Sequence, residues 1–450
     1  MIHLILLSGG SGTRLWPLSN NTRSKQFLKV LRDNDGNHIS MVQRVFSQLQ
    51  QVPAATSVTI ATTSSQQYSI ESQISGDYAL VLEPERRDTA PAIMLACKHL
   101  LSEQNASTGD SVIVMPIDSF ADQAYYDKII ELDSFIQLGC VDLVLLGVEP
   151  TYPSTKYGYI VPSKSDGSGI QQVEEFKEKP DEKTAQALIE RGGLWNCGVF
   201  GFKLGYLDAI TRSYCNAETF ADLCARYGEL PKNSFDYEVV ERVSGIGVLS
   251  YSGVWKDLGT WNTLSEEMAD CASGRVIGVN STCKNTHVIN ELGIPMVVTG
   301  INDSVVVATH DGILVAEKDS SSTMKPLVER VAESRPMYEQ RRWGQYRVLD
   351  SNAFQDGSRT LVKELIINDG CQLSYQVHRY RREVWTVTCG AGEVVLDGRV
   401  RPISAGSVID IPLGVMHACR AFDTLHLVEV QLGDLLEEAD IERYGDYWDE

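Results

Sequence analysis

The 450-residue chain has no long apolar run, no C-x-x-C pair and no excess of basic residues. No stretch reaches the roughly 18 consecutive apolar residues of a membrane-spanning helix, so we expect no contact with a membrane. The formal net charge of −20 leaves no basic surface for a polyanion, which argues against nucleic acid as a partner. The ten cysteines are scattered, and the chain begins on an apolar stretch instead of a charged leader. These features are typical of a reduced, cytoplasmic protein.

The length predicts two or three domains, and the first of these shows an α/β pattern. Up to about residue 270, short apolar runs at 2–7, 57–61, 111–115 and 143–148 alternate with helical spacing, as at 89–101. Strands that alternate with helices predict a Rossmann-like fold with a mostly parallel sheet. Ligands of such a sheet bind at the carboxyl ends of its strands.

Beyond residue 270 the pattern becomes β-rich. Residues 271–335 contain short β-prone pieces and a connector, and residues 336–450 contain longer β runs separated by turn residues. The second pattern predicts a small β-barrel. We therefore expect three parts, with boundaries at 1–270, 271–335 and 336–450.

The most specific pattern directly follows the first predicted strand. Residues 7–19 read LSGGSGTRLWPLS, and Lys25 follows shortly after. Glycines let the backbone approach a ligand closely and present its N–H groups to phosphate oxygens. The loop lacks the Gly-Lys-Ser/Thr of a P-loop, and Leu15 stands where a dinucleotide-binding loop requires glycine. The pattern predicts a phosphate-binding loop of a different kind, with Arg14 and Lys25 as its cations.

This loop closely resembles the signature loop of the sugar-nucleotide pyrophosphorylases, above all the mannose-1-phosphate guanylyltransferases, down to LWPLS at 15–19. The resemblance implies GTP and a sugar 1-phosphate as substrates, and a short β-helix-like segment within 271–335. EPERRDTAP at 83–91 matches a further family run, although Arg86 and Asp88 replace its usual glycine and asparagine. The residues that the resemblance assigns to nucleotide binding are Gly9, Gly10, Gly12, Thr13, Arg14, Glu83 and Thr89.

Nucleotidyl transfer brings negative charge onto negative charge, so the site needs cations and carboxylates that hold Mg²⁺. Asp118 follows a predicted strand in MPID, and Asp257 lies in VWKDLGTW, which is similar to the family's W-x-D-x-G motif. The resemblance implies that these two aspartates hold Mg²⁺, while Arg14 and Lys25 stabilise the leaving pyrophosphate. Either aspartate alone could equally be a helix cap or turn residue.

Four further segments resemble the family's sugar-phosphate site. In FKEKPD at 176–181, the resemblance assigns Glu178 to sugar hydroxyls and Lys179 to the attacking phosphate. The amide of Asn196 in WNCGVF can both donate to and accept from a sugar hydroxyl. The full implied set is Gly158, Glu178, Lys179, Asn196 and Asp236.

The C-terminal part has the two-part spacing of a cupin. Its four potential ligands are Gln376, His378, Glu383 and His417. Imidazole, carboxylate and amide oxygen suit Zn²⁺, Mn²⁺ or Fe²⁺. Glutamine in the first place resembles the type II phosphomannose isomerase half of bifunctional enzymes, so a second, mannose-6-phosphate isomerase activity is implied. Because Arg379, Tyr380 and Val384 replace family histidines, a structural or oligomerising cupin is the alternative.

Together these patterns predict an enzyme that transfers GMP from GTP to α-D-mannose 1-phosphate. The products, GDP-mannose and pyrophosphate, would serve polysaccharide or glycan synthesis, and we expect a homo-oligomer such as a dimer. One alternative keeps the chemistry but uses a heptose, fucose or glucose 1-phosphate, since a single hydroxyl contributes only a few kcal/mol to discrimination. Another alternative is a nucleotide-sugar-binding protein without catalysis, although the charged residues of the site are all present: Arg14, Lys25, Asp118, Lys179 and Asp257.

Overall fold

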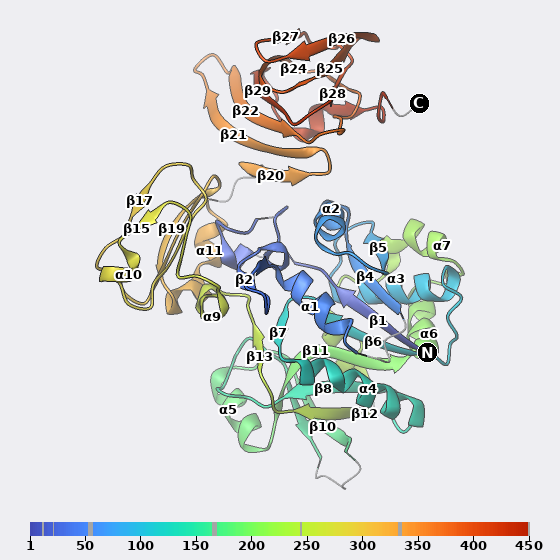
Figure 1. Ribbon diagram of the computed structural model, residues 1–450. Helices are drawn as coiled ribbons and strands as arrows, with labels where there is room; N and C mark the ends of the chain where they lie inside the picture. Colours follow the sequence, from blue (N-terminus) through green and yellow to red (C-terminus); the bar gives the residue numbers. More distant parts are fainter. Residues whose placement is uncertain are drawn as a thin grey trace.

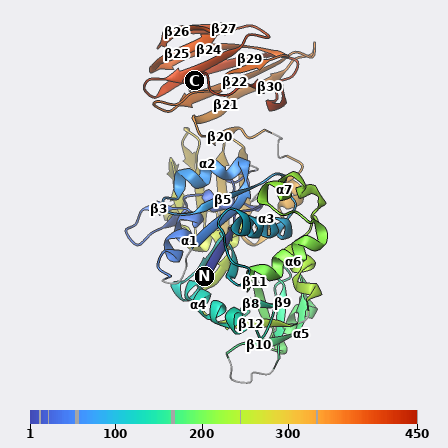
Figure 2. The ribbon, with the colours of Figure 1, turned by 90° about the vertical axis from the view of Figure 1, so that its right-hand side faces the viewer.

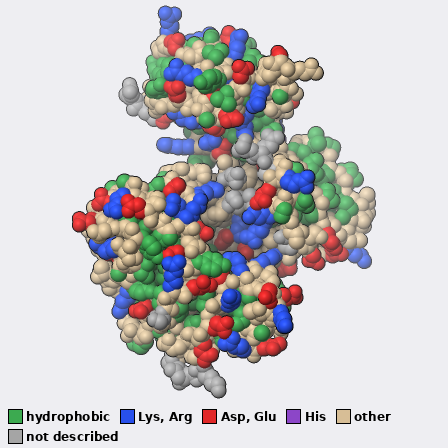
Figure 3. Space-filling view, turned by 180° about the vertical axis from the view of Figure 1, so that it is seen from behind, with side chains coloured by type: hydrophobic (Ala, Val, Ile, Leu, Met, Phe, Trp, Pro, Cys, Tyr) green, Lys and Arg blue, Asp and Glu red, His purple; other side chains and the backbone are tan. Residues whose placement is uncertain are grey.

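The computed structural model describes residues 1–10, 13–20, 22–52, 57–163, 169–243, 245–331 and 335–448. They form three lobes in chain order: an α/β lobe, a small β lobe at its side and a β lobe beyond both (Figures 1 and 2). From behind, acidic and basic side chains are intermingled over the surface (Figure 3). The overall negative charge is therefore not gathered into one patch on this face.

A nine-stranded sheet forms the centre of the α/β lobe, in the order β5-β4-β1-β6-β11-β8-β12-β10-β9. Every strand runs in one direction except β10 and β11, which are antiparallel to their neighbours. The expectation of a mostly parallel sheet is therefore correct, but the reversed β11 inside it was not predicted. The strands are β1 (Ile2–Leu7), β4 (Ser57–Thr63), β5 (Ala79–Glu83), β6 (Ser111–Pro116), β8 (Leu143–Val148), β9 (Tyr159–Pro162), β10 (Gln171–Lys177), β11 (Leu194–Lys203) and β12 (Ile246–Tyr251).

Helices cover both faces of this sheet. In β1, Leu4 and Leu6 pack into the core on one face and Ile5 into the core on the other, as strand alternation requires. The first core contains side chains from α1 (Met41–Leu49), α2 (Ser64–Gln73), α4 (Gln123–Leu138) and α5 (Glu182–Glu190). The second contains side chains from α3 (Thr89–Ser102), α6 (Leu204–Tyr214), α7 (Phe220–Ala225) and α8 (Phe235–Glu238).

Short elements extend the carboxyl edge of the sheet. The β7 strand (Ser119–Ala121) follows β6 and pairs antiparallel with β13 (Trp255–Asp257), which follows β12. The other short elements of this lobe are β2 (Leu31–Arg32), β3 (His38–Ile39) and α9 (Trp261–Glu267). Strand ends that are distant in sequence therefore meet at one edge, where ligands of such sheets bind.

The small β lobe has two sheets, of order β14-β16-β18-β19 and β15-β17. Pairing is parallel between β14, β16 and β18 and between β15 and β17, whereas β19 is antiparallel to β18. The β-helix-like segment stays a prediction. The elements are β14 (Ala272–Ser273), β15 (Val276–Ile277), α10 (Val279–Thr282), β16 (His287–Asn290), β17 (Met296–Val297), β18 (Ser304–Thr309), β19 (Gly312–Glu317) and α11 (Lys325–Val328).

The last lobe consists of two sheets with a shared core. Their orders are β20-β21-β22-β29-β24-β27 and β26-β25-β28-β23-β30. Inward-facing side chains such as Leu365, Trp385 and Leu427 fill the space between them. The strands are β20 (Tyr338–Arg341), β21 (Gly344–Ala353), β22 (Arg359–Ile367), β23 (Gln376–His378), β24 (Arg381–Cys389), β25 (Ala391–Leu396), β26 (Arg399–Ser404), β27 (Val408–Ile411), β28 (His417–Ala421), β29 (Leu425–Gly433) and β30 (Ile441–Arg443).

Two sequence expectations concern the whole chain. Within the described ranges, no helix combines the length and apolar character required to cross a membrane. All ten cysteines fall within the described residues, and each is a free thiol.

Candidate active site

The structure brings Lys25 between Asp118 and Asp257. The ammonium of Lys25 lies 2.7 Å from Oδ2 of Asp118 and 3.0 Å from Oδ1 of Asp257. The β7–β13 pairing explains this convergence, because it sets Asp257 directly opposite Ser119, the neighbour of Asp118. Two carboxylates that are far apart in sequence therefore lie on one cation, the ammonium of Lys25. The role in Mg²⁺ binding that the family resemblance implies for them stays a prediction.

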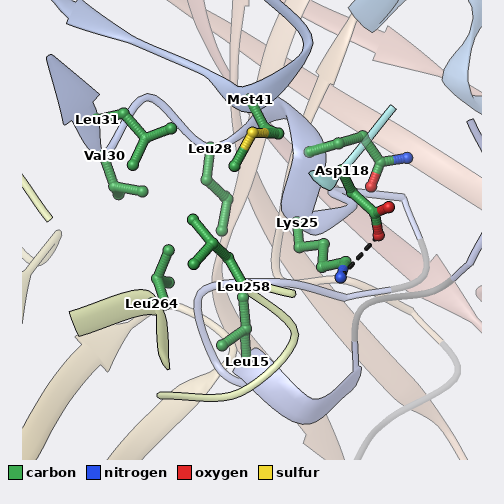
Figure 4. Close-up of a pocket in the computed structure, with 10 residues that line it drawn as sticks. Leu15, Lys25, Leu28, Val30, Leu31, Met41, Asp118, Leu258 and Leu264 are labelled. Atoms are coloured by element: carbon green, nitrogen blue, oxygen red, sulfur yellow. Dashed lines mark ion pairs between the residues drawn. The ribbon is translucent and has the colours of Figure 1, made fainter. Parts of the chain in front are cut away.

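An apolar hollow lies beside this ion cluster. Leu15, Leu28, Met41 and Leu258 line it, and the Lys25–Asp118 pair lies at its end (Figure 4). Burial alone would lower the pKa of Lys25, but the two carboxylates outweigh it and hold the pKa above its ordinary value. Lys25 is therefore a fixed cation across the physiological pH range.

The cation cluster also controls Asp257. Burial alone would raise the pKa of this carboxyl, but Lys25, Arg14 and Lys156 together lower it. Sequence reasoning missed Lys156. Burial and the neighbouring Arg14 lower its pKa, and Asp257 opposes that effect. Asp257 is thus ionised among three cations, an arrangement suited to a polyanionic ligand.

The glycine loop presents its backbone to open space. Gly9 and Gly10 are exposed, and a Cβ at either would meet no atom within 4 Å. Gly10 has φ +96°, and its carbonyl accepts a hydrogen bond of 3.1 Å from Oγ of Ser24. Gly12 lies outside the described residues, and of Thr13 only the backbone is described.

A buried glutamine that sequence reasoning missed supports this loop. Nε2 of Gln66 donates to Oγ of Ser24 at 2.7 Å, while Oε1 accepts from Ser8 at 3.2 Å and from Gln26 at 3.3 Å. Because buried polar groups must be paired, this network fixes the loop base relative to Lys25. A lone glutamine in a helix carries no sequence signal for such a role.

The five predicted sugar-phosphate residues lie together. Nδ2 of Asn196 donates to Oδ1 of Asp236 at 2.6 Å, and the backbone N–H of Asn196 donates to the carbonyl of Gly158 at 2.8 Å. Lys179 forms an ion pair with Glu178. A Cβ at position 158 would collide with Oε2 of Glu178, so only glycine leaves that carboxylate its place.

The charged groups of this cluster influence one another. Burial and the neighbouring Glu178 raise the pKa of Asp236 to about 6, although Asn196 and Lys179 oppose the shift. Oε2 of Glu178 is buried and has no hydrogen-bond partner. An unsatisfied buried acceptor is costly, so this oxygen is suited to receive a hydroxyl from a ligand.

An aromatic cluster connects the two halves of the site. The ring of Tyr157 lies 5.0 Å from Trp195 and 5.4 Å from Trp255, between ring centroids. Trp195 precedes Asn196 in the sugar pocket, and Trp255 lies two residues before Asp257. Sequence reasoning did not assign these rings, although they flank the motif residues.

The structure places Glu83 and Thr89 at the side of the sheet that carries α8. The hydroxyl of Tyr227 donates to Oε2 of Glu83 at 2.9 Å, and burial raises the pKa of Glu83 to about 7. Oγ1 of Thr89 accepts from the backbone N–H of Phe235 at 2.9 Å. Thr89 thus ties the start of α3 to α8, the helix that carries Asp236.

In the last lobe, the four predicted cupin residues converge. Nε2 of His378 lies 3.1 Å from Oε1 of Glu383, and Nε2 of His417 lies 3.7 Å from Oε2 of the same carboxylate. The amide of Gln376 lies 3.4 Å from His378 and 3.5 Å from His417. Within the described residues, the two histidines and the glutamate form one group whose ligand atoms all lie within 4.8 Å of one another.

Hydrogen bonds from neighbouring side chains fix the orientation of the Glu383 carboxylate in this cluster. Trp385 donates to Oε2 of Glu383 at 3.1 Å, and Arg381 and Gln431 donate to Oε1 at 3.0 and 3.1 Å. Burial alone would raise the pKa of Glu383, but His378, His417 and Arg381 hold it well below its usual range. An ionised, oriented carboxylate between two imidazoles fits a divalent cation. The replaced positions Arg379 and Tyr380 lie outside the group, with Arg379 paired to Glu442 and Tyr380 59% exposed.

The fold and the first site define a nucleotidyltransferase with an appended cupin-type domain. Residues 3–274 match the Nucleotidyl transferase family, and residues 329–446 match the Mannose-6-phosphate isomerase C-terminal family. The chain belongs to the nucleotidyl transferase family and carries a C-terminal mannose-6-phosphate isomerase domain.

Similarity to individual proteins extends over nearly the whole chain. The chain is 33% identical to the xanthan biosynthesis protein XanB of Xanthomonas campestris pv. campestris (strain B100), over 98% of each chain. It is 31% identical to the mannose-1-phosphate guanylyltransferase of Escherichia coli (strain K12), over 99% of this chain and 98% of that one. A crystal structure from Thermus thermophilus, described as a mannose-1-phosphate geranyltransferase, aligns with a TM-score of 0.59 and 27% identity, over 73% of this chain and 98% of that one.

Proposed function

We propose that the chain transfers GMP from GTP to α-D-mannose 1-phosphate and so forms GDP-mannose and pyrophosphate. The observation that carries the proposal is the Lys25–Asp118–Asp257 cluster, joined through Tyr157 and Trp255 to the pocket around Asn196. The names of the relatives support mannose 1-phosphate as the acceptor and polysaccharide synthesis as the destination of the product.

The chemistry follows from the charges that the chain supplies. A phosphate oxygen of the sugar 1-phosphate attacks the α-phosphorus of GTP in line, and the bond to the bridging oxygen of the β-phosphate breaks. Lys179 neutralises the attacking phosphate, while Glu178 and Asn196 orient the sugar hydroxyls. Arg14 and Lys25 stabilise the pyrophosphate as it leaves.

Asp118 and Asp257 would hold Mg²⁺. Their carboxylates already converge on one cation, the ammonium of Lys25, and oxygen donors are the ligands that Mg²⁺ prefers. When bound, Mg²⁺ supplies charge neutralisation at the phosphates. Lys25 holds the two carboxylates close together, at the position where they would bind the metal.

The test is pyrophosphate release by the purified protein with each of four NTPs and with mannose, glucose, fucose and heptose 1-phosphates. The proposal predicts that GTP with mannose 1-phosphate is used with the highest kcat/KM. A higher kcat/KM with another sugar or base would replace the substrate and keep the chemistry. Absence of release with every pair would favour a binding protein without catalysis.

A second activity is proposed for the cupin domain, because the buried His378–Glu383–His417 group persists despite the replaced histidines. These residues, with Gln376, would hold Zn²⁺, Mn²⁺ or Fe²⁺, which would polarise the sugar carbonyl during mannose-6-phosphate isomerisation. Conversion of mannose 6-phosphate to fructose 6-phosphate, measured after loading with each metal, tests it. No conversion with any metal would leave the domain a structural or oligomerising module.

The domain boundaries and the oligomeric state are also proposals. We place the domain boundaries at 1–270, 271–335 and 336–450, and we expect a homodimer. Light scattering of the intact chain tests the second expectation, and a monomeric mass would contradict it.

A further inference from the structure

Asn20 and residues 22–24 lie between the phosphate loop and Lys25, and hydrogen bonds join them into a turn. Oδ1 of Asn20 accepts hydrogen bonds from the backbone N–H groups of Thr22 at 2.9 Å and Arg23 at 2.7 Å. The backbone N–H of Asn20 donates to the carbonyl of Arg23 at 3.0 Å. Ser24 then bonds Gly10, and Lys25 follows. The shape of this turn therefore sets the position of Lys25 relative to the glycine loop.

The amide nitrogen of Asn20 is hydrogen-bonded to a residue of the small β lobe. Its Nδ2 donates to Oδ2 of Asp311 at 2.7 Å, and Asp311 lies in the turn between β18 and β19. Oδ1 of Asp311 accepts from the backbone N–H of Met337 at 2.7 Å, just before β20 of the cupin domain. One carboxylate thus joins the catalytic turn, the small β lobe and the segment that enters the cupin domain.

Three further contacts join the phosphate-loop region of the α/β lobe to the small β lobe. Oγ1 of Thr309 donates to the carbonyl of Pro17 at 3.1 Å, and Arg23 forms two hydrogen bonds of 2.7 Å to Glu291. A Cβ at Gly312 would collide with the ring of Trp16. Four residues between the two cations of the loop are therefore anchored on the small β lobe: Trp16, Pro17, Asn20 and Arg23.

We propose that Asp311 is a positioning residue for nucleotidyl transfer, which acts through Asn20 on the phosphate loop and on Lys25. This inference rests on the proposed function, because the proposed function assigns the triphosphate of GTP to the phosphate loop. The kinetic tests of Asp311 measure use of that GTP. In the part of the chain that the structure describes, the Asp311 carboxylate accepts from Asn20 and Met337, and neither is a predicted substrate-binding residue. Its effect is transmitted by the Asn20 turn.

The first test compares Asp311→Ala with Asp303→Ala, which removes a carboxylate that is hydrogen-bonded to Asn285 within the same lobe. A displacement of about 1 Å at a reacting group costs up to roughly 100-fold in rate, so we expect D311A to lower kcat/KM for GTP about 10- to 100-fold. The KM for mannose 1-phosphate should stay within about twofold, because the sugar pocket lies on other strands. D303A should match the wild type. Equal GTP kinetics in D311A and D303A would overturn the proposal.

A donor–acceptor exchange separates positioning from a general loss of structure. Asn20→Asp alone would set two carboxylates against each other and should be the most impaired variant. Asp311→Asn combined with Asn20→Asp lets the amide at position 311 donate to the carboxylate at position 20, which still accepts from Thr22 and Arg23. The double variant should regain most of the GTP kcat/KM that N20D loses. No recovery would contradict the positioning role.

A further readout does not depend on the substrate. Hydrogen–deuterium exchange of peptides covering 14–28 should be faster in D311A than in D303A, and close to the wild type in the exchanged double variant. Unchanged exchange in D311A would refute the anchoring even if the wild type used another sugar or base. Failure of the wild type to release pyrophosphate would instead refute the proposed function and leave this measurement valid.

Discussion

At the scale of single residues, the candidate active site consists of partly buried charged groups that pair with one another. Lys25 is only 13% exposed, whereas Asp118 and Asp257 are 30% and 28% exposed. The three groups stabilise one another, because removal of one partner leaves the others desolvated and unpaired.

Substitution Lys25→Ala tests this dependence. Loss of the ammonium leaves two carboxylates facing each other and removes a cation from the leaving group. We expect kcat to fall about 100-fold or more and the free energy of unfolding to decrease, because two partly buried carboxylates are left without their cation. Steady-state pyrophosphate release and urea denaturation measure the two quantities, and the exposed Lys29→Ala is the control. Wild-type turnover in K25A would contradict the assigned role.

Lys156 provides a second test among the cations. Its charge helps to lower the pKa of Asp257, and it lies in the field of Arg14, so Lys156→Gln should weaken binding of a phosphate-bearing substrate. We expect KM for GTP or for mannose 1-phosphate to rise about 10-fold, the cost of one charge-assisted contact. Lys183→Gln, on the exposed side of α5, should leave both KM values unchanged. Equal KM values in the wild type, K156Q and K183Q would show that Lys156 does not contribute to substrate binding.

Asp236 makes stability depend on pH. Its folded-state pKa of about 6 lies above its ordinary value of 3.8, so between these values the unfolded state binds fewer protons. The contribution of Asp236 to stability is therefore present below pH 4 and is lost as pH rises through 6, up to about 3 kcal/mol. Asp236→Asn should lack this loss. Urea unfolding of both proteins from pH 4 to 7 measures the difference, and parallel pH curves would contradict the assignment.

At the scale of elements, the geometry of the site comes from pairing at strand ends. The β7–β13 ladder joins the two aspartates, and the pairing of β9 with the end of β10 brings Gly158 next to Glu178 in the predicted sugar-phosphate site. Gly158 permits that second contact, since any side chain there would displace Glu178.

Gly158→Ala is therefore expected to impair sugar binding selectively. Displacement of Glu178 should raise KM for mannose 1-phosphate about 10-fold or more, while KM for GTP stays within about twofold. Gly293→Ala is the control, because a Cβ there meets no atom within 4 Å. Steady-state kinetics with each substrate varied in turn measures this, and an equal change in both KM values would argue against a selective effect.

The sequence predicted the elements of the α/β lobe better than their order. Ile2–Leu7, Ser111–Pro116 and Leu143–Val148 are continuous apolar runs, and each forms a buried strand as expected. The reversal of β11 could not be read from its sequence, because side-chain alternation is the same in parallel and antiparallel strands. Contacts between segments that are distant in sequence, such as Asn20 with Asp311, could not be predicted from the sequence either.

At the scale of the whole molecule, two chemically distinct centres share one chain. The transfer site has carboxylates and cations, whereas the cupin group has imidazoles and one carboxylate. The donor sets suit different metals, so the two centres should be separable by substitution.

His417→Ala tests this separation. We expect the wild type to retain about one transition-metal ion per chain after loading and dialysis, and H417A to retain little. Pyrophosphate release with excess Mg²⁺ should stay within about twofold, since the lobes have separate cores. Elemental analysis and kinetics on the same samples measure both, with thermal unfolding as a check on the fold. Equal metal content would refute the cupin ligand set.

The sequence by itself determined the chemistry of this protein, because motifs such as LSGGSGTRLWPLS and WKDLG specify residue types at short range. It also indicated the cupin group, because three of its four residues lie close together in the chain. Only the tertiary structure decided which groups meet: Lys25 with both aspartates, and Asp311 with the side-chain amide of Asn20. These contacts join segments that are distant in sequence, and their distances depend on how the strands pair and the lobes pack, which no local pattern contains.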